Sequence, residues 1–157
     1  MNVQPATKQD LDVLVRMARD WNDAGKLDQA GLEFDPDTVR SLFRLSILQG
    51  YCLVAVDAAQ QLVGVISAIR YPWLGNARQL VLNEIIWWVE PHARGNRAGS
   101  KLREALERLA FRDPLVHGLV ISVMSASRPS VAAAMAENGY APMQTQFYKE
   151  TIHAGIQ

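Results

Sequence analysis

The chain has 157 residues, of which 49% are hydrophobic, and its formal net charge at pH 7 is zero. This length and composition predict one globular domain over residues 1–157, with enough apolar side chains for a substantial core. A chain without net charge has no overall field that attracts nucleic acid or an anionic membrane, so we expect neither as a partner.

The first third of the chain predicts a strand and two helices. Residues 3–6 are expected to form a short strand, and residues 7–10 have the composition of a helix start. Residues 21–34 are polar and include two glycines, which predicts a loop or a broken helix. Asp35-Pro36 suits the N-cap and first position of a second helix, which Gly50 would end.

The middle of the chain predicts three consecutive strands. Residues 51–56 and 62–71 are rich in β-branched and aromatic side chains, and residues 57–61 between them predict a hairpin. Residues 72–75 are expected to turn the chain into a third strand at residues 80–89.

A helix, a strand, a helix and a final strand are expected in the last third. They cover residues 98–111, 119–124, 129–137 and 143–151, and Asn138-Gly139 is expected to end the second helix. In the first helix, Leu102, Ala105, Leu106 and Leu109 would face the core, and Lys101, Arg103, Glu104, Glu107 and Arg108 would face water.

This order predicts a mixed α/β fold, in which about four helices flank a central mixed sheet. The early strands are expected to be antiparallel, because short connections join them. The helix at residues 98–111 would make a parallel crossover to the following strand.

Residues 83–102 are the most informative part of the chain. An apolar strand there runs into a short loop that carries Pro91, Arg94 and Arg97, and the loop opens directly onto a helix. Free backbone amides, the positive end of a helix dipole and guanidinium charge would meet at this place. The arrangement suits a phosphate or pyrophosphate.

The run Arg94-Gly95-Asn96-Arg97-Ala98-Gly99 resembles the acyl-CoA pyrophosphate loop of the GNAT superfamily of N-acyltransferases. That family pattern is Arg or Gln, two residues, Gly, one residue, then Gly or Ala. Element order extends the resemblance over nearly the whole chain, and sequence similarity is concentrated in residues 80–110 and, more weakly, 119–148. The alternative is a strand–helix connection with solvated arginines.

Arg97 departs from the pattern, which has a glycine there. A bulky side chain would either hinder the pyrophosphate and disfavour a positive φ, or point outward and add a cation to the phosphate site. We favour the second interpretation, because Arg94 and the helix start are intact.

The resemblance implies acetyl-CoA as co-substrate, and the scattered histidines of the chain indicate no metal site. It also implies a sheet that splays between the strand ending at Val89 and the strand at residues 119–124, with pantetheine held in the split. Arg128 would either reach a CoA phosphate or stay solvated. The implied cofactor-binding residues are Trp87, Trp88, Val89, Arg94, Gly95, Asn96, Arg97, Ala98, Gly99, Ser100 and Arg128.

Glu84 is the candidate for the base that takes a proton from the acceptor amine. Strand alternation would place it on one face with Leu82, Ile86 and Trp88, where desolvation would raise its pKa. It lies five residues before Val89, about 16 Å along a strand, which matches an extended pantetheine arm. The alternative is a sheet-surface glutamate paired with an arginine or a lysine.

The family often protonates the leaving thiolate from a tyrosine four residues before a Gly-aromatic pair. Gly139-Tyr140 supplies that pair here, but Met135 occupies the tyrosine position, and Arg128 replaces an asparagine common at the helix start. Hydroxyl groups near a helix start are more often caps than proton donors. The alternative donors are Ser127, Ser130, Tyr148 and water.

Acceptor specificity is expected to come from residues 20–35 and from the turn at residues 71–74. The acidic bias of the first segment would favour a cationic amine, although the same residues also suit helix ends and solvated loops. The acidic residues are Asp20, Asp23, Asp28, Glu33 and Asp35.

Other chemistry-bearing side chains point to no second site. The single Cys52 excludes an internal disulfide and agrees with a reducing compartment. His92, His117 and His153 lack the spacing of metal ligands. The first ten residues do not resemble a signal peptide, and no apolar run reaches the ~20 residues of a membrane span. We therefore expect a cytoplasmic protein.

The resemblance thus implies an N-acetyltransferase that moves an acetyl group from acetyl-CoA to a primary amine of a small molecule or protein by direct attack. The alternatives are a non-catalytic acyl-CoA-binding module and an acyltransferase with a longer acyl donor, whose pocket Trp88, Ile86 and Met124 would line. A nucleotide-binding α/β domain would need a Gly-rich loop after the first strand, and none is present. The family often dimerises, and the apolar, Trp-bearing surface permits a homodimer.

Overall fold

The computed structural model describes residues 1–27, 32–123 and 129–143. The chain divides into two compact units. Met1–Trp21 and Asp35–Ser122 form the first unit, which contains the whole sheet, whereas Asn22–Phe34 and the chain from Val123 onward form the second. Glu84 and the loop of residues 90–97 lie in the first unit.

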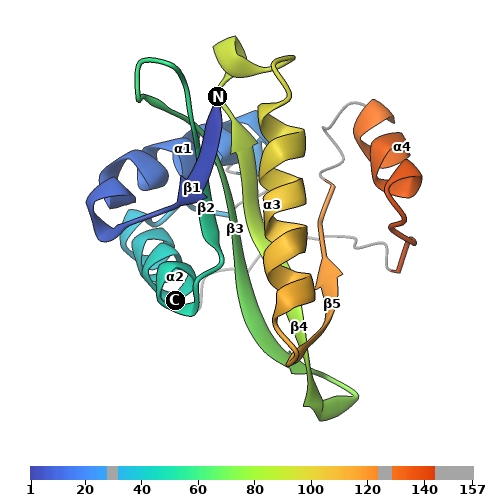
Figure 1. Ribbon diagram of the computed structural model, residues 1–157. Coiled ribbons are helices and arrows are strands. Elements are labelled where there is room, and N and C mark those ends of the chain that lie inside the picture. The colour runs from blue at the N-terminus through green and yellow to red at the C-terminus, as the bar shows by residue number, and fades with distance from the viewer. Residues whose placement is uncertain (28–31, 124–128, 144–157) are drawn as a thin grey trace, which may run out of the picture. The chain divides into compact units, whose positions relative to one another are not determined.

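A five-stranded mixed sheet forms the centre of the first unit (Figure 1), in the spatial order β1-β2-β3-β4-β5. The first three pairings are antiparallel, and β4 and β5 run parallel. The mixed sheet predicted from the sequence is confirmed. The strands are β1 (Asn2–Pro5), β2 (Cys52–Val56), β3 (Leu62–Trp73), β4 (Asn76–Val89) and β5 (Val116–Val120).

Four α-helices accompany these strands in the described chain, and a short 3-10 turn at Lys8–Asp10 precedes the first. Asp35 caps α2, because its carboxylate accepts hydrogen bonds from the amides of Asp37 and Thr38. Gly50 ends that helix in the left-handed region, as predicted. The helices are α1 (Leu11–Ala24), α2 (Pro36–Gln49), α3 (Ala98–Arg112) and α4 (Pro129–Glu137), and α4 belongs to the second unit.

Helices cover both faces of the sheet in the first unit (Figure 1). Gly64 of β3 faces α3, because a Cβ built on it would lie 3.2 Å from Leu102 Cδ1. Ser67 of β3 faces the other way, and its hydroxyl donates to Ser46 Oγ of α2 at 2.8 Å. α3 and α2 therefore lie on opposite sides of the sheet.

The main core lies between α3 and the sheet. It combines Leu102 and Leu106 of α3 with buried residues of β2, β3 and β4. Arg103, which was expected to face water, is only 5% exposed, so that prediction is wrong. Its guanidinium forms an ion pair with Glu107, one helical turn later. This pair stabilises the positive charge while the aliphatic part of the Arg103 side chain is packed.

Among the predicted boundaries in the first 100 residues, three are wrong by two residues or more. α1 continues to Ala24, into the segment expected to be a loop or a broken helix. β3 extends to Trp73, because Pro72 lies opposite Leu80 at an irregular point of the ladder, where a residue without an N–H is tolerated. The turn is therefore confined to residues 74–75, and β4 begins at Asn76.

The fifth strand also differs from the prediction of residues 119–124. β5 begins at Val116 and ends at Val120, because its extent is set by pairing with Leu80 to Asn83 of β4. The final strand predicted at residues 143–151 lies outside the described residues except Met143, which is in no strand.

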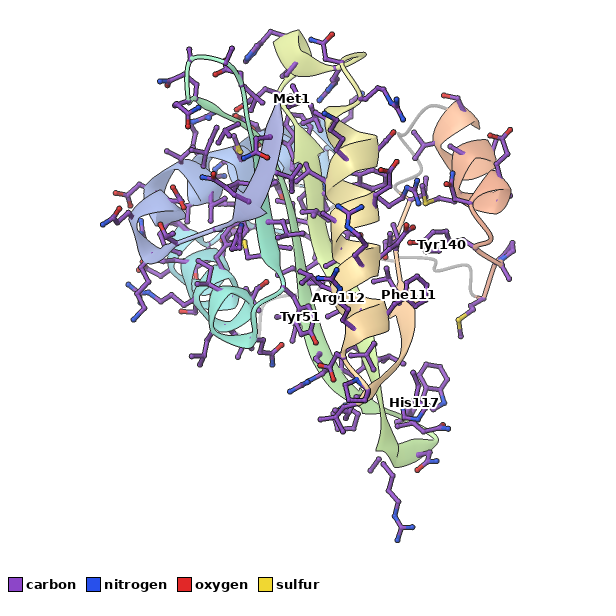
Figure 2. The ribbon with its side chains drawn as sticks, in the orientation of Figure 1. Met1, Tyr51, Phe111, Arg112, His117 and Tyr140 are labelled. Carbon is purple, nitrogen blue, oxygen red and sulfur yellow. The ribbon has the colours of Figure 1, made fainter. Side chains whose placement is uncertain are left out.

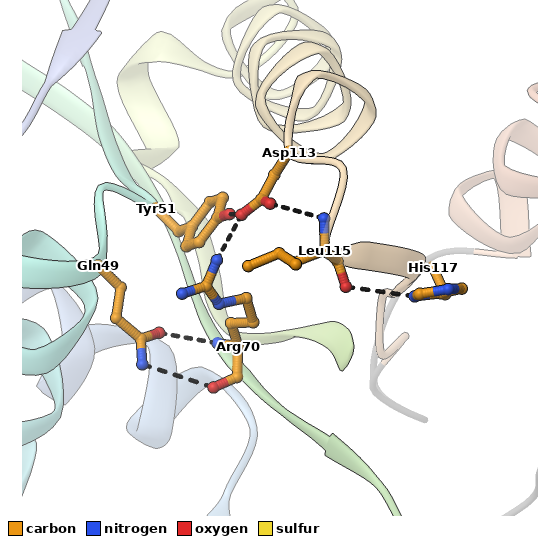
Figure 3. A network of polar contacts seen from close by, with 6 residues as sticks. All are labelled: Gln49, Tyr51, Arg70, Asp113, Leu115 and His117. Carbon is orange, nitrogen blue, oxygen red and sulfur yellow. Dashed lines mark hydrogen bonds and ion pairs between the residues drawn. The ribbon is translucent and has the colours of Figure 1, made fainter. Parts of the chain in front are cut away.

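A polar network secures the C-terminal end of α3 to β2 and β3 (Figure 3). Asp113 accepts hydrogen bonds from the Tyr51 hydroxyl and from the Arg70 guanidinium, and its other oxygen accepts from the Leu115 amide at 2.9 Å. The bond from Tyr51 is the main cause that holds the pKa of Asp113 below its ordinary value. Gln49 also contacts the backbone of Arg70.

The surface near this end carries exposed large side chains. Phe111 projects into solvent from the last turn of α3 (Figure 2) and is 87% exposed. Tyr71, Trp73 and Leu74, in and beside the β3–β4 turn, are also exposed. No helix in the described part of the chain has the length and apolar character needed to cross a bilayer.

Leu102→Ala should lower the free energy of unfolding by about 3 kcal/mol, because Leu102 is fully buried between α3 and the sheet. Leu48→Ala on α2 is the matched control, since Leu48 is 83% exposed and its loss should change stability by less than about 0.5 kcal/mol. Urea titrations measure both. Equal effects would contradict this assignment of the core.

Candidate active site

The sheet opens between β4 and β5. Their parallel pairing ends at Asn83 opposite Val120, whereas β4 continues to Val89. Glu90, just past the strand, donates its amide to Val63 O of β3 at 2.9 Å. Because successive residues of a strand point their backbone groups to alternate sides, Trp87 and Val89 present theirs to the side that β5 has left. The splay implied by the resemblance is present.

One extra residue in β4 changes which side chains share a face. Ser67 of β3 lies opposite Ile86, but the next residue, Ala68, lies opposite Glu84, so Ile85 forms a bulge. Leu82 packs in the core with Leu102, and Trp87 lies 3.5 Å from a Cβ built on Gly99, so both face α3 although their numbers differ by five. In a regular strand, side chains five positions apart face opposite sides. The bulge must therefore reverse the alternation between Leu82 and Trp87.

The expected shared face of Glu84, Leu82, Ile86 and Trp88 is therefore only half right. Glu84 and Leu82 face α3, whereas Ile86 and Trp88 lie opposite Ser67 and Val65 on the other face. The bulge is the reason, because simple alternation across residues 82–88 assumes an unbroken ladder.

Glu84 is a buried carboxylate at the point where the sheet opens. It is 6% exposed, and its Oε2 accepts a hydrogen bond from the Ser122 amide at 3.1 Å. Burial raises the pKa of Glu84 to about 7, and the bond from Ser122 opposes part of that rise. A carboxyl with this pKa can both take up and release a proton near neutral pH.

The loop of residues 90–97 leads from β4 to α3 through two left-handed positions. Pro91–Ala93 forms a 3-10 turn, and Gly95 follows with a φ of +86°. Arg97 directly precedes α3 and has a φ of +60°. The conformation that the family pattern assigns to a glycine is thus kept by an arginine, at a steric cost of roughly 1–2 kcal/mol.

No side chain in residues 1–27, 32–123 and 129–143 caps the N-terminus of α3. Its first helical hydrogen bond runs from the Lys101 amide to Arg97 O at 3.0 Å. The amides of Ala98, Gly99 and Ser100 have no acceptor within the helix, so they and the helix dipole offer a place for an anion.

The Arg94 side chain contacts β4, and these contacts hold the loop in place. Its Nε donates to Val89 O at 2.9 Å, and its guanidinium carbon lies 4.5 Å from the ring centroid of Trp88. Trp88 itself is buried, and its indole nitrogen has no hydrogen-bond partner within the part of the chain that the structure describes. Stacking over an indole ring stabilises a guanidinium and restricts its position.

A second brace comes from α1, which the sequence did not indicate. Arg16 Nη2 bonds to Glu90 Oε1 at 2.8 Å, and Glu90 O accepts the Ala93 amide at 2.9 Å. Glu90 is 8% exposed, so this pair ties the loop entrance to α1. The residues lie 74 positions apart, and only the local Arg16–Asp20 spacing of four residues was visible in the sequence.

The other predicted site residues divide into two groups. Ser127, Arg128, Tyr148 and Met124 lie outside the described residues. Met135 and Ser130 lie on α4 in the second unit. No cluster of three potential metal ligands is found within residues 1–27, 32–123 and 129–143.

Two of the acidic residues expected to favour a cationic acceptor, Asp20 and Asp35, have local side-chain partners. Asp20 pairs with Arg16 at 2.8 Å, and Asp35 caps α2. Asp28 lies outside the described residues. The interpretation as helix ends and solvated loops accounts for Asp20 and Asp35.

Glu84→Gln should change how stability depends on pH. The folded-state pKa, about 7, lies above the ordinary 4.5, so the folded protein holds a proton that the unfolded chain releases within this window. Wild-type stability should therefore fall as pH rises from about 4.5 to 7, by up to about 3 kcal/mol. Urea titrations at pH 5 and 8 test this. Glu104→Gln, at a more exposed glutamate, should keep the wild-type trend; an identical trend in Glu84→Gln would contradict the assignment.

Arg97→Gly should stabilise the fold by about 0.5–1 kcal/mol. Relief of the left-handed strain outweighs the extra chain entropy of glycine in the unfolded state. Arg97→Ala retains a Cβ and should give no such gain. Thermal denaturation compares the three proteins, and equal melting temperatures for the Gly and Ala variants would count against strain at this position.

The sequence itself identifies a family, and structures of known proteins resemble the fold. The sequence matches the family described as Acetyltransferase (GNAT) domain over residues 1–140. No curated protein matches it. A possible acetyltransferase from Clostridium difficile 630 has a similar structure, with 16% identity, a TM-score of 0.69, and coverage of 97% of this chain and 98% of the other.

Two further structures are similar at low identity. A predicted acetyltransferase with acetyl-CoA from Clostridium acetobutylicum has 15% identity, a TM-score of 0.68 and 95% coverage of both chains. A ribosomal-protein-alanine N-acetyltransferase from Brucella melitensis biovar Abortus 2308 has 14% identity, a TM-score of 0.67, and coverage of 97% of this chain and 100% of the other. These likenesses concern the fold, and the family match covers most of the sequence: the chain belongs to the GNAT acetyltransferase family.

Proposed function

We propose that the protein is an N-acetyltransferase that transfers the acetyl group of acetyl-CoA to a primary amine of a small molecule or a protein. Family membership supports acyl transfer from an acyl-CoA. One structurally similar protein is described with acetyl-CoA, and another as acting on a ribosomal-protein alanine. These support the choice of donor and of an amine acceptor.

The observation that carries the proposal is the position of Glu84. Its buried carboxyl stands where β4 separates from β5, and its pKa of about 7 suits a base at neutral pH. From there the open edge of β4 leads over five residues, about 16 Å, to Val89 and the loop of residues 90–97.

The same edge would hold the pantetheine arm. The N–H and C=O groups of Trp87 and the N–H of Val89 face the open side, and an amide-bearing chain can pair with them as a strand would. Val89 O is already bonded to Arg94. The pyrophosphate would bind the free amides of residues 98–100, with Arg97 as the adjacent cation.

The proposed reaction is direct attack. Acetyl-CoA supplies a thioester, whose carbonyl carbon forms a bond to the amine nitrogen as its bond to sulfur breaks. Glu84 takes the proton that the amine loses, and the CoA thiolate leaves. Water or a hydroxyl group then protonates the thiolate, since Met135 replaces the tyrosine expected from the family resemblance.

A non-catalytic acyl-CoA-binding module is the second candidate. Met135 supports it, because a thioether cannot donate a proton to a leaving thiolate. A longer acyl donor, a cytoplasmic location and a homodimer stay predictions from the sequence. For the longer donor, Ile86 and Trp88 would have to act from the face opposite Glu84.

Release of CoA from acetyl-CoA over a panel of small amines and N-terminal peptides tests the proposal. At least one acceptor should be turned over, and Glu84→Gln should lower kcat by about 100-fold or more while acetyl-CoA affinity is kept, because only proton uptake is lost. Glu104→Gln is the control with wild-type rates. Acetyl-CoA binding by calorimetry without turnover of any amine would favour the binding module, and succinyl- and longer acyl-CoA donors test acyl-chain preference.

A further inference from the structure

Where the backbone ladder between β4 and β5 stops, a side chain accepts the next hydrogen bond between the two segments. Asn83 and Val120 are the last paired residues of β4 and β5. Two residues later, the Ser122 amide has no backbone acceptor on β4 and instead donates to Glu84 Oε2 at 3.1 Å. The carboxylate thus replaces a main-chain acceptor at the point of divergence.

We propose that the backbone amide of Ser122 is the group that positions Glu84 for catalysis, holding Oε2 so that Oε1 is the oxygen that receives the proton. Within the described residues, Oε2 is the only carboxylate oxygen of Glu84 with a hydrogen-bond partner. The positioning role rests on the proposed acyl-transfer function, whereas the hydrogen bond and its effect on Glu84 do not.

Among the described residues, no charged side chain of the neighbouring elements contacts the Glu84 carboxylate. On β3, Ala68 lies opposite Glu84, and the charged residue on the same face, Arg70, is committed to Asp113. On α3, Leu102 and Leu106 face the sheet. Next to these two leucines on α3, Lys101 donates to Met1 O, and Arg103 pairs with Glu107. On β5, the ring of His117 contacts Leu115 O.

An amide that donates to a carboxylate stabilises its charged form. Loss of the Ser122 N–H should therefore raise the pKa of Glu84, and the acid limb of the kcat/KM profile should move to higher pH. A shift of about one pH unit is expected, which is a tenfold loss of activity well below the pKa. This shift of the pH profile distinguishes a role in positioning Glu84 from a purely structural contact.

Nuclear magnetic resonance of the free protein tests the bond without any substrate. The Ser122 amide proton should titrate with a midpoint near the Glu84 pKa of about 7, and Glu84→Gln should abolish this titration. A Ser122 amide that does not titrate, or that titrates equally in Glu84→Gln, would overturn the proposal.

Ser122→Pro removes the amide, and Ser122→Ala keeps it. The carboxyl carbon resonance of Glu84 should report a pKa raised by about one unit in the proline variant and unchanged in the alanine variant. An unchanged pKa in a folded Ser122→Pro protein would also overturn the proposal; if that variant does not fold, the titration of wild type against Glu84→Gln decides. Titration of Ser122 without turnover of any amine would instead refute the proposed function and leave the hydrogen bond standing.

Discussion

A strand that continues beyond its parallel partner leaves backbone groups unpaired, and the organisation of this site depends on that constraint. β4 runs to Val89, while its ladder with β5 stops at Asn83. A buried polar group without a hydrogen-bond partner costs roughly 1–3 kcal/mol. Each backbone group on the open edge of β4 therefore needs water, a ligand or a side chain as its hydrogen-bond partner. Glu84 accepts the amide of Ser122 and Arg94 donates to Val89 O, so two side chains meet part of this need.

The bulge at Ile85 changes which side chains of β4 face α3. Before the bulge, Leu82 and Glu84 face α3, and after it Trp87 and Val89 do so. Trp88 is thereby turned to the opposite face, where its ring carries the guanidinium of Arg94. A single inserted residue therefore places Glu84 and Trp87 on the face toward α3 and Trp88, which contacts Arg94, on the other face.

The two ends of α3 are held in place in different ways. At its C-terminal end, the C-cap residue Asp113 binds Tyr51, which directly precedes β2, and Arg70 of β3, so the end of the helix is tied to the sheet. At its N-terminal end no side chain of the described residues caps the helix, and the preceding loop is held by Arg94 and by the Glu90 pair with Arg16. These contacts hold the loop and leave the first amides of α3 without a side-chain acceptor from the described part of the chain.

The sequence by itself determined the features that depend on short stretches of chain. The Asp35 cap, the Gly50 stop, the start of α3 at Ala98 and the family resemblance of residues 94–99 all follow from local spacing. Tertiary structure alone decided the extent of β5, the face of Ile86 and Trp88, and the contacts of Glu84 and Glu90 with residues 38 and 74 positions away. Register and bulges are set by pairing between distant segments, so no pattern within one strand reveals them.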